Sequence, residues 1–242
     1  MLAEKLLKPP SAVANYIEDV FSTYLYTGTS GYKTITNGID LATKGGLIWL
    51  KDRTNPYGAA TDNVLFSTAD ITKYLTSNTT DAYTTQSVSL AKISSVNTDG
   101  FECVGSTIGA NTNTYASWTF RKQPKFFDCG TYTGTGSNRT VPHNLGSTPG
   151  VIIVKQTSAS GRGWVTYHRS LGATKYVYLD ANYAEDTWSI VWNNTAPTST
   201  EFTVGTFAGV NESGQSYVYY AFAHDAGGFG LTGTDNVISC GS

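Results

Sequence analysis

The sequence predicts an all-β protein made of two tandem β-sandwich units, preceded by a short N-terminal α-helix. Three observations support this prediction. The composition favours strands and turns, the apolar residues fall in short runs between turn residues, and several segments recur in the same order in the two halves of the chain. An ordered recurrence of this kind indicates a duplicated structural unit. The 242 residues are enough for two units that each bury a core.

The polar residues of the composition are mostly uncharged. Only 14% of the residues are charged, against roughly 25% in an ordinary soluble domain. Tyr, Thr, Val and Trp fit a pleated sheet, while Gly, Asn and Pro fit turns. The net charge of -2 argues against a nucleic-acid partner, because phosphate binding needs a basic face. The sequence has neither a long apolar run nor a secretory signal, so we expect synthesis in the cytoplasm and no membrane insertion.

Residues 1–21 are predicted to be an attachment segment with a helix over residues 11–21. Ser11 follows two prolines and can cap a helix, and apolar side chains recur after it at helical spacing. A helix this short needs a surface to pack against. Folding back onto the first unit stays open as an alternative, but docking on another chain is the prediction. The residues predicted to make this attachment are Leu6, Leu7, Tyr16, Ile17 and Val20.

Five segments recur in order, roughly 100 residues further along the chain. The pairs are residues 26–29 with 132–135, 47–51 with 151–155, 72–75 with 174–177, 101 with 202, and 113–115 with 215–217. The apolar runs at 47–51 and 151–155, and the aromatic runs at 115–120 and 217–222, are typical of strands. The first unit is therefore predicted over residues 22–125 and the second over residues 126–227. Residues 228–242 are a linker, the start of a third repeat, or a closing strand of the second unit.

The residues that usually carry catalysis are scattered along the sequence. His143, His168 and His224 are far apart, and no two of them have the spacing of metal ligands on one element. Cys103, Cys129 and Cys240 form no close pair. The neighbours Glu185 and Asp186 would point to opposite faces of a strand, so they do not form an acid/base pair. We therefore predict no enzyme activity, no catalytic residue, no metal and no cofactor.

Aromatic residues offer a different kind of site. Trp49 and Trp118 lie inside apolar strands and are predicted to be core residues. Trp188 and Trp192 have a spacing that would place them on one face of a strand, where they could stack on sugar rings or fill the core. The second unit is the better candidate for contact with glycans, because its aromatic residues are concentrated in one stretch. That stretch carries Arg162, His168, Tyr176, Tyr178, Tyr183, Trp188 and Trp192.

The repeated pattern resembles a family of phage tail-fibre and virion structural proteins, common in marine and cyanobacterial phages. In the first unit it is carried by Gly-Leu-Ile-Trp-Leu-Lys-Asp-Arg at 46–53 and by residues 74–79, 97–101 and 114–120. In the second unit it is carried by residues 142–146, 148–155, 163–168 and 217–222. The resemblance covers about residues 22–230. It implies that the β-sandwich units are of a lectin-like or jelly-roll-like type and that the protein is a homotrimer, and it brings no active site with it.

These observations lead to a functional expectation. The chain is expected to be a structural component of a phage virion, a tail fibre or an adjoining tail part, which binds other virion proteins through its N-terminal segment. A carbohydrate-binding module that recognises host surface glycans is the first alternative. A capsid decoration protein is the second.

Overall fold

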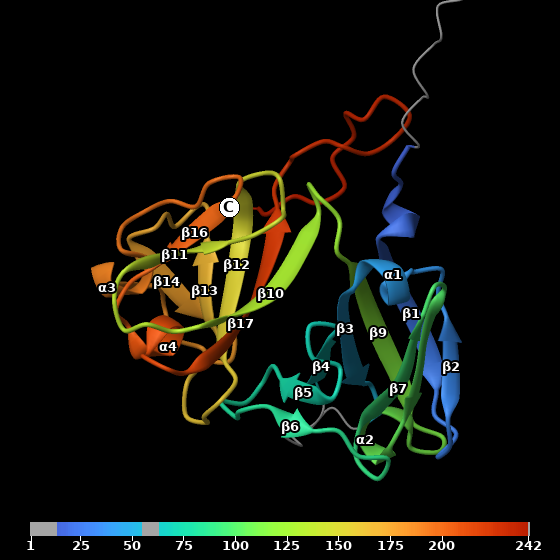
Figure 1. Ribbon diagram of the computed structural model, residues 1–242. Coiled ribbons are helices and arrows are strands. Elements are labelled where there is room, and N and C mark those ends of the chain that lie inside the picture. The colour runs from blue at the N-terminus through green and yellow to red at the C-terminus, as the bar shows by residue number, and fades with distance from the viewer. Residues whose placement is uncertain (1–13, 55–62, 242) are drawn as a thin grey trace, which may run out of the picture.

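The computed structural model describes residues 14–54 and 63–241, and within them the chain is mostly antiparallel β-structure. The all-β class predicted from the sequence is confirmed. The strands belong to two six-stranded sheets and two smaller sheets (Figure 1). We call the part from β1 to β9 the first half and the part from β10 to β17 the second half.

The two large sheets have the same strand order. In the first half this order is β1 (Phe21–Thr27), β9 (Thr114–Arg121), β3 (Gly46–Asp52), β4 (Asn63–Ser67), β5 (Lys73–Thr76) and β6 (Thr84–Thr85). In the second half it is β10 (Phe127–Thr133), β17 (Ser216–Ala223), β12 (Pro149–Gln156), β13 (Val165–His168), β14 (Lys175–Tyr178) and β15 (Asp186–Thr187). The segments that recur in the sequence thus occupy equivalent strands, with β3 corresponding to β12 and β9 to β17.

The registers correspond as well. Leu47 lies opposite Phe120 in the first sheet, and Val151 lies opposite Phe222 in the second. At the far edge, Lys73 lies opposite Thr85 and Lys175 opposite Thr187. A shift of one residue would turn every side chain to the other face of the sheet, so shared registers give the two sheets the same arrangement of faces.

Each large sheet faces a smaller one. The first half adds β2 (Lys33–Thr36), β8 (Gly100–Val104) and β7 (Lys92–Asn97), and the second half adds β11 (Arg139–Pro142) and β16 (Glu201–Val204). Within the described residues, four short α-helices complete these elements: α1 (Leu41–Lys44), α2 (Ser106–Gly109), α3 (Ser189–Trp192) and α4 (Ala208–Asn211). Along the chain, α3 comes between β15 and β16, as β7 comes between β6 and β8. None of the helices in the described residues is long and apolar enough to cross a membrane.

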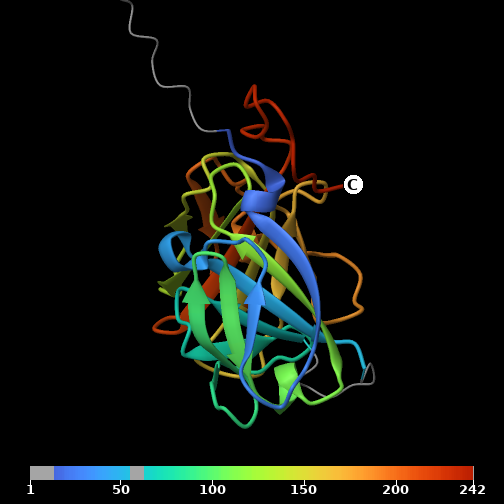
Figure 2. The same cartoon turned by 90° about the vertical axis from the view of Figure 1, so that its right-hand side faces the viewer.

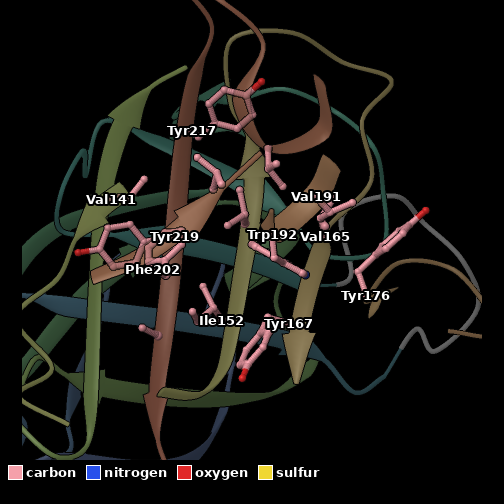
Figure 3. Packing of buried hydrophobic residues seen from close by; sticks show 14 of the residues in the cluster. Val141, Ile152, Val165, Tyr167, Tyr176, Val191, Trp192, Phe202, Tyr217 and Tyr219 are labelled. Atoms are coloured by element: carbon pink, nitrogen blue, oxygen red, sulfur yellow. The ribbon is translucent and has the colours of Figure 1, made fainter. Parts of the chain in front are cut away.

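Three apolar clusters hold the molecule together. The first half buries Ile48, Phe66 and Tyr115 between its large and small sheets. The second half does the same with a richer aromatic set that includes Phe202 and Tyr219 (Figure 3). The third cluster lies between the two large sheets and is built from both halves. Because successive side chains of a strand point to opposite faces, each large sheet can serve two clusters at once.

The beginning of the described chain is not the predicted helix. Residues 14–16 are not helical, Ile17–Asp19 form a single 3-10 turn, and Phe21 already belongs to β1. The helix predicted over residues 11–21 is therefore wrong over 14–21, and residues 11–13 lie outside the described chain. The cause is pairing with β9, which draws Phe21 into the sheet opposite Phe120. Helical spacing over so few residues is too weak to compete with this pairing.

Residues 228–241 form neither of the strands that the sequence left open. They fold back as a loop, in which Phe229 forms an isolated bridge with Asp235 and is buried against Phe126. The Gly230 N–H donates to the Asn15 carbonyl oxygen at 2.8 Å, so this loop contacts the start of the described chain (Figure 1).

Candidate functional site

The two halves meet through the outer faces of their large sheets, the faces turned away from their own small sheets. Leu47, Leu65 and Leu75 from the first half pack with Phe127, Val218 and Tyr220 from the second. The Phe120 ring lies 5.5 Å from that of Phe127 and 5.6 Å from that of Phe222. Figure 2 looks at this stack with the first half nearest the viewer. The contact is an apolar core in its own right, so the halves form one body.

On one side of this contact, side chains and backbone of the second half form hydrogen bonds with the loop that follows β5. The fully buried indole of Trp164 donates from Nε1 to the Thr79 carbonyl oxygen at 3.0 Å. The amine of Lys155, also fully buried, donates to the carbonyl oxygens of Thr80 at 3.1 Å and Arg162 at 2.7 Å. The Tyr83 N–H adds a bond to the Thr157 carbonyl oxygen at 3.0 Å. The contact is closed around Trp164 and Lys155, and a polar hollow of about 550 Å³ remains farther along it, beside Tyr83 and Thr157.

The environment of Lys155 is unusual for a lysine. Burial lowers the pKa of its amine from 10.5 to about 8, although Asp180 and Asp81 pull it the other way. Two carbonyl oxygens match the two protons of a neutral amine, whereas an ammonium group has three protons to satisfy. Its equivalent in the first half, Lys51, is only partly buried.

The equivalent side of the contact is open. In the first half, Lys51 lies opposite Asn63. In the second half, Val154 lies opposite Val165, so the next step along the same ladder sets Lys155 opposite Trp164. Asn63 is therefore the equivalent of Trp164, and a small amide stands where the second half has an indole. Beside Asn63 is a surface hollow of about 720 Å³. It is lined by Trp49, Asn63, Ser77, Asn78, Leu179, Asp180, Ala181, Asn182 and Tyr183.

The walls of this hollow are partly aromatic. Trp49 of β3 packs edge-on to Trp118 of β9, with ring centroids 6.1 Å apart, and both are only partly buried. A smaller hollow of about 320 Å³ continues along Trp118 and Phe120. Tyr183 stands on the opposite wall with 73% of its surface exposed. A third hollow of about 350 Å³ lies between Tyr183 and Tyr178.

The polar groups of the hollow are amides, hydroxyls and one carboxylate. Asp180 is held in place because its Oδ1 accepts a hydrogen bond from the Trp164 N–H at 2.8 Å. Asn63, Asn78 and Asn182 contribute side-chain amides, which both donate and accept. Among the described residues that line these three adjoining hollows, none is a lysine or an arginine. The arrangement can receive a polar ligand with apolar faces.

Trp188 and Trp192 do not form the predicted shared face. They stand at the two ends of α3, not on a strand: Trp188 is the residue before the helix and Trp192 its last residue. Trp192 is 2% exposed and packs in the second-half cluster against Tyr167 (Figure 3). Trp188 is 44% exposed and packs against Phe207, with ring centroids 5.0 Å apart. The strand interpretation is wrong because the chain turns through a helix here, which sends the two rings in different directions.

The residues predicted to attach the chain divide into three groups. Leu6 and Leu7 lie outside the described residues. Tyr16 and Ile17 are 38% and 36% exposed. Val20 is fully buried in the cluster between the halves, so the prediction that it contacts another chain is wrong. It belongs to the molecule's own core because it directly precedes β1, which brings it beside β9.

Of the histidines and cysteines, His224 and Cys240 lie side by side, because the Cys240 N–H donates to His224 Nδ1 at 3.1 Å. Within residues 14–54 and 63–241, no group of three or more His, Cys, Asp or Glu side chains could hold a metal ion. Cys103, Cys129 and Cys240 are all buried and unpaired as disulfides. Burial raises the pKa of the Cys103 and Cys129 thiols to about 12. Burial also lowers the pKa of His143.

Sequence reasoning missed most of the hollow. Trp49 and Trp118 were predicted to be core residues, and Asn63 was not predicted to belong to any site. Tyr183 was included only as one member of an aromatic stretch. Extending the repeat by one strand would have aligned Asn63 with Trp164, and that mismatch is the signal that marks the place.

The comparisons with known proteins found one matching family model and no matching individual protein. The search of curated proteins found no match, and neither did the search of solved structures. A family model described as "Domain of unknown function (DUF7483)" matches residues 17–235, nearly the whole chain. This span includes both halves and the hollow between them. The chain therefore belongs to the DUF7483 family.

Proposed function

We propose that the chain is a non-enzymatic structural component of a phage virion, a tail fibre or an adjoining tail part. In this proposal the two halves are tandem lectin-type β-sandwich units over residues 22–125 and 126–227. Residues 1–21, apart from the buried Val20, bind other virion proteins, and the protein assembles as a homotrimer. The sequence resemblance given above suggests the setting.

The observation that carries the proposal is the joining of two repeats into one body. The contact between the halves has its own apolar cluster, and the loop after β5 is fixed by Trp164 and Lys155. Interfaces between independent domains are usually more polar and permit relative motion. A stiff pair of stacked repeats suits a part that must hold its shape on the outside of a particle.

The first test concerns location. Particles of the phage that encodes the chain are purified and analysed by mass spectrometry, then labelled with a gold-conjugated antibody against residues 14–241. We expect the chain in the particles, with the label on the tail. Label on the capsid would favour the decoration protein instead. Absence from purified particles would refute the proposal.

The second test concerns attachment. Deleting residues 1–13 leaves every described contact in place, including those of Val20. We expect the shortened chain to fold and to be missing from particles. Normal incorporation of the shortened chain would show that attachment lies elsewhere.

A third test concerns the homotrimer. The mass of the purified chain in solution, measured by light scattering, should be three times its 26.0 kDa.

A further inference from the structure

The hollow beside Asn63 has a defined structural origin. The loops after β5 and β14 are equivalent, and each lies against the large sheet of the other half. The loop after β5 is closed in by the Trp164 indole, while the loop after β14, residues 179–183, faces the shorter Asn63. The space left by that difference is bounded by side chains from both halves. A volume of about 720 Å³ falls within the ~300–1,000 Å³ usual for small-ligand sites.

The chemistry of the hollow narrows the class of ligand. Trp49 and Trp118 offer ring surface on one wall, and the well-exposed Tyr183 offers it on the other. Aromatic rings of this kind give large, rigid contact area at low entropic cost, with a polar handle on Tyr and Trp. Beside the rings stand the amides of Asn63, Asn78 and Asn182, suited to hydroxyl groups that both donate and accept.

The charge of the lining residues limits the class of ligand further. The described lining residues include the carboxylate of Asp180 and no basic side chain. An anionic ligand would be repelled by Asp180, and Lys51, which lies opposite Asn63, is not among the residues that line the hollow. Phosphate and carboxylate ligands are typically held by Arg or Lys in the site itself. A neutral ligand whose ring has apolar faces and a hydroxyl-bearing edge fits both kinds of wall.

We propose that this hollow between the two halves is a binding site for a neutral oligosaccharide, one sugar ring of which lies between Trp49 and Tyr183. The adjoining hollow along Trp118 and Phe120 receives the next ring of the chain. This inference goes beyond the proposed place in a particle and rests on the hollow alone. It also moves the sugar contact away from Trp188 and Trp192.

The test uses the full purified chain and a panel of neutral oligosaccharides, built from glucose, galactose, mannose or N-acetylglucosamine. Binding is measured by calorimetry and by the change in tryptophan fluorescence. We expect at least one member of the panel to bind. Asn63→Trp, which installs the residue of the equivalent position, should weaken that binding by about tenfold or more, and so should Tyr183→Ala.

Two matched variants serve as controls. Tyr32→Ala removes a tyrosine that is 59% exposed and lies outside the hollow, and Trp188→Ala removes the exposed indole on α3. Both should bind the same sugar as the wild type does. Circular dichroism verifies that every variant is folded.

Three results would overturn the proposal. They are no binding by any member of the panel, unchanged binding in folded Asn63→Trp, and binding that is lost in Trp188→Ala while Asn63→Trp keeps it. None of them affects the particle-location test, so failure here is distinguishable from failure of the proposed virion role.

Discussion

The halves touch at two equivalent places, and the two contacts differ. At one, the Trp164 indole fills the space under the loop that follows β5; at the other, Asn63 leaves a hollow under the loop that follows β14. Strand order and register are the same around both places. The repeated backbone thus determines where the halves meet, while the size of one side chain determines whether the contact is closed or open.

The largest effect should come from opening the closed side. Trp164→Asn removes a fully buried indole and its bond to Thr79. We expect the free energy of unfolding to fall by about 3–5 kcal/mol, as for other large aromatic deletions in cores. Urea denaturation followed by circular dichroism measures the loss. The control is Trp188→Asn at a 44% exposed site, where less than about 1 kcal/mol is expected. Equal losses in both would contradict the comparison.

A second prediction concerns Lys155 on the closed side. Its pKa in the folded chain is about 8, below its ordinary value of 10.5. The folded chain therefore holds this proton less tightly than the unfolded chain does, so stability rises with pH between these values. From about pH 7.5 to about pH 9.5 we expect a gain of about 2 kcal/mol.

The measurement is urea denaturation at both pH values, for the wild type and for Lys155→Met. The variant has no amine to titrate and should lack this rise. A rise of the same size in the variant would assign the effect to other groups.

Closing the open side should have a smaller effect of opposite sign. Asn63→Trp is expected to raise the free energy of unfolding by about 0.5–2 kcal/mol, the usual gain from filling a cavity. Asn182→Trp, at an exposed position on the same hollow, should change it little. Thermal unfolding of the three proteins shows the order. Destabilisation by Asn63→Trp would mean that the two places are less alike than their registers indicate.

The prediction with the smallest expected effect tests whether the two halves separate from each other before they unfold. Cys129 lies at the contact, its Sγ 3.8 Å from Ser67 Oγ, while Cys103 lies in the core of the first half. With Cys240 replaced by Ser, both thiols should resist a thiol reagent in the native state, because burial raises their pKa to about 12. In rising urea we expect them to react together. Earlier reaction of Cys129 would show that the contact opens first.

The sequence allowed much of the fold to be predicted. The strands at 47–51, 115–120, 151–155 and 217–222 are present, because short apolar or aromatic runs between turns have few other ways to bury themselves. The helix at 11–21 failed over its described part because local spacing cannot foresee that Phe21 pairs with Phe120. Trp192 was placed on a strand because period two and one turn of helix look alike over four residues.

The candidate site was harder to predict, for a physical reason. Whether Trp49 belongs to a core or to a surface depends on what covers the outer face of its sheet. That cover comes from the other half, through contacts such as those of Trp164 with Thr79, which no local pattern encodes. Composition pointed toward the aromatic second half, yet the hollow takes its two tryptophans from the first.

The use of one equivalent face by both halves resembles the isologous interface of a two-fold homodimer. In a homodimer of identical subunits, symmetry applies any substitution twice. A substitution that opens one contact therefore opens the symmetry-related contact as well. Covalent linkage of the two copies removes that obligation. Here one half has Trp164, which fills the contact, while the other has Asn63 at the equivalent position, beside an open hollow. An opening at only one of these two equivalent positions, beside Asn63, is therefore possible in a joined pair and impossible in a symmetric homodimer.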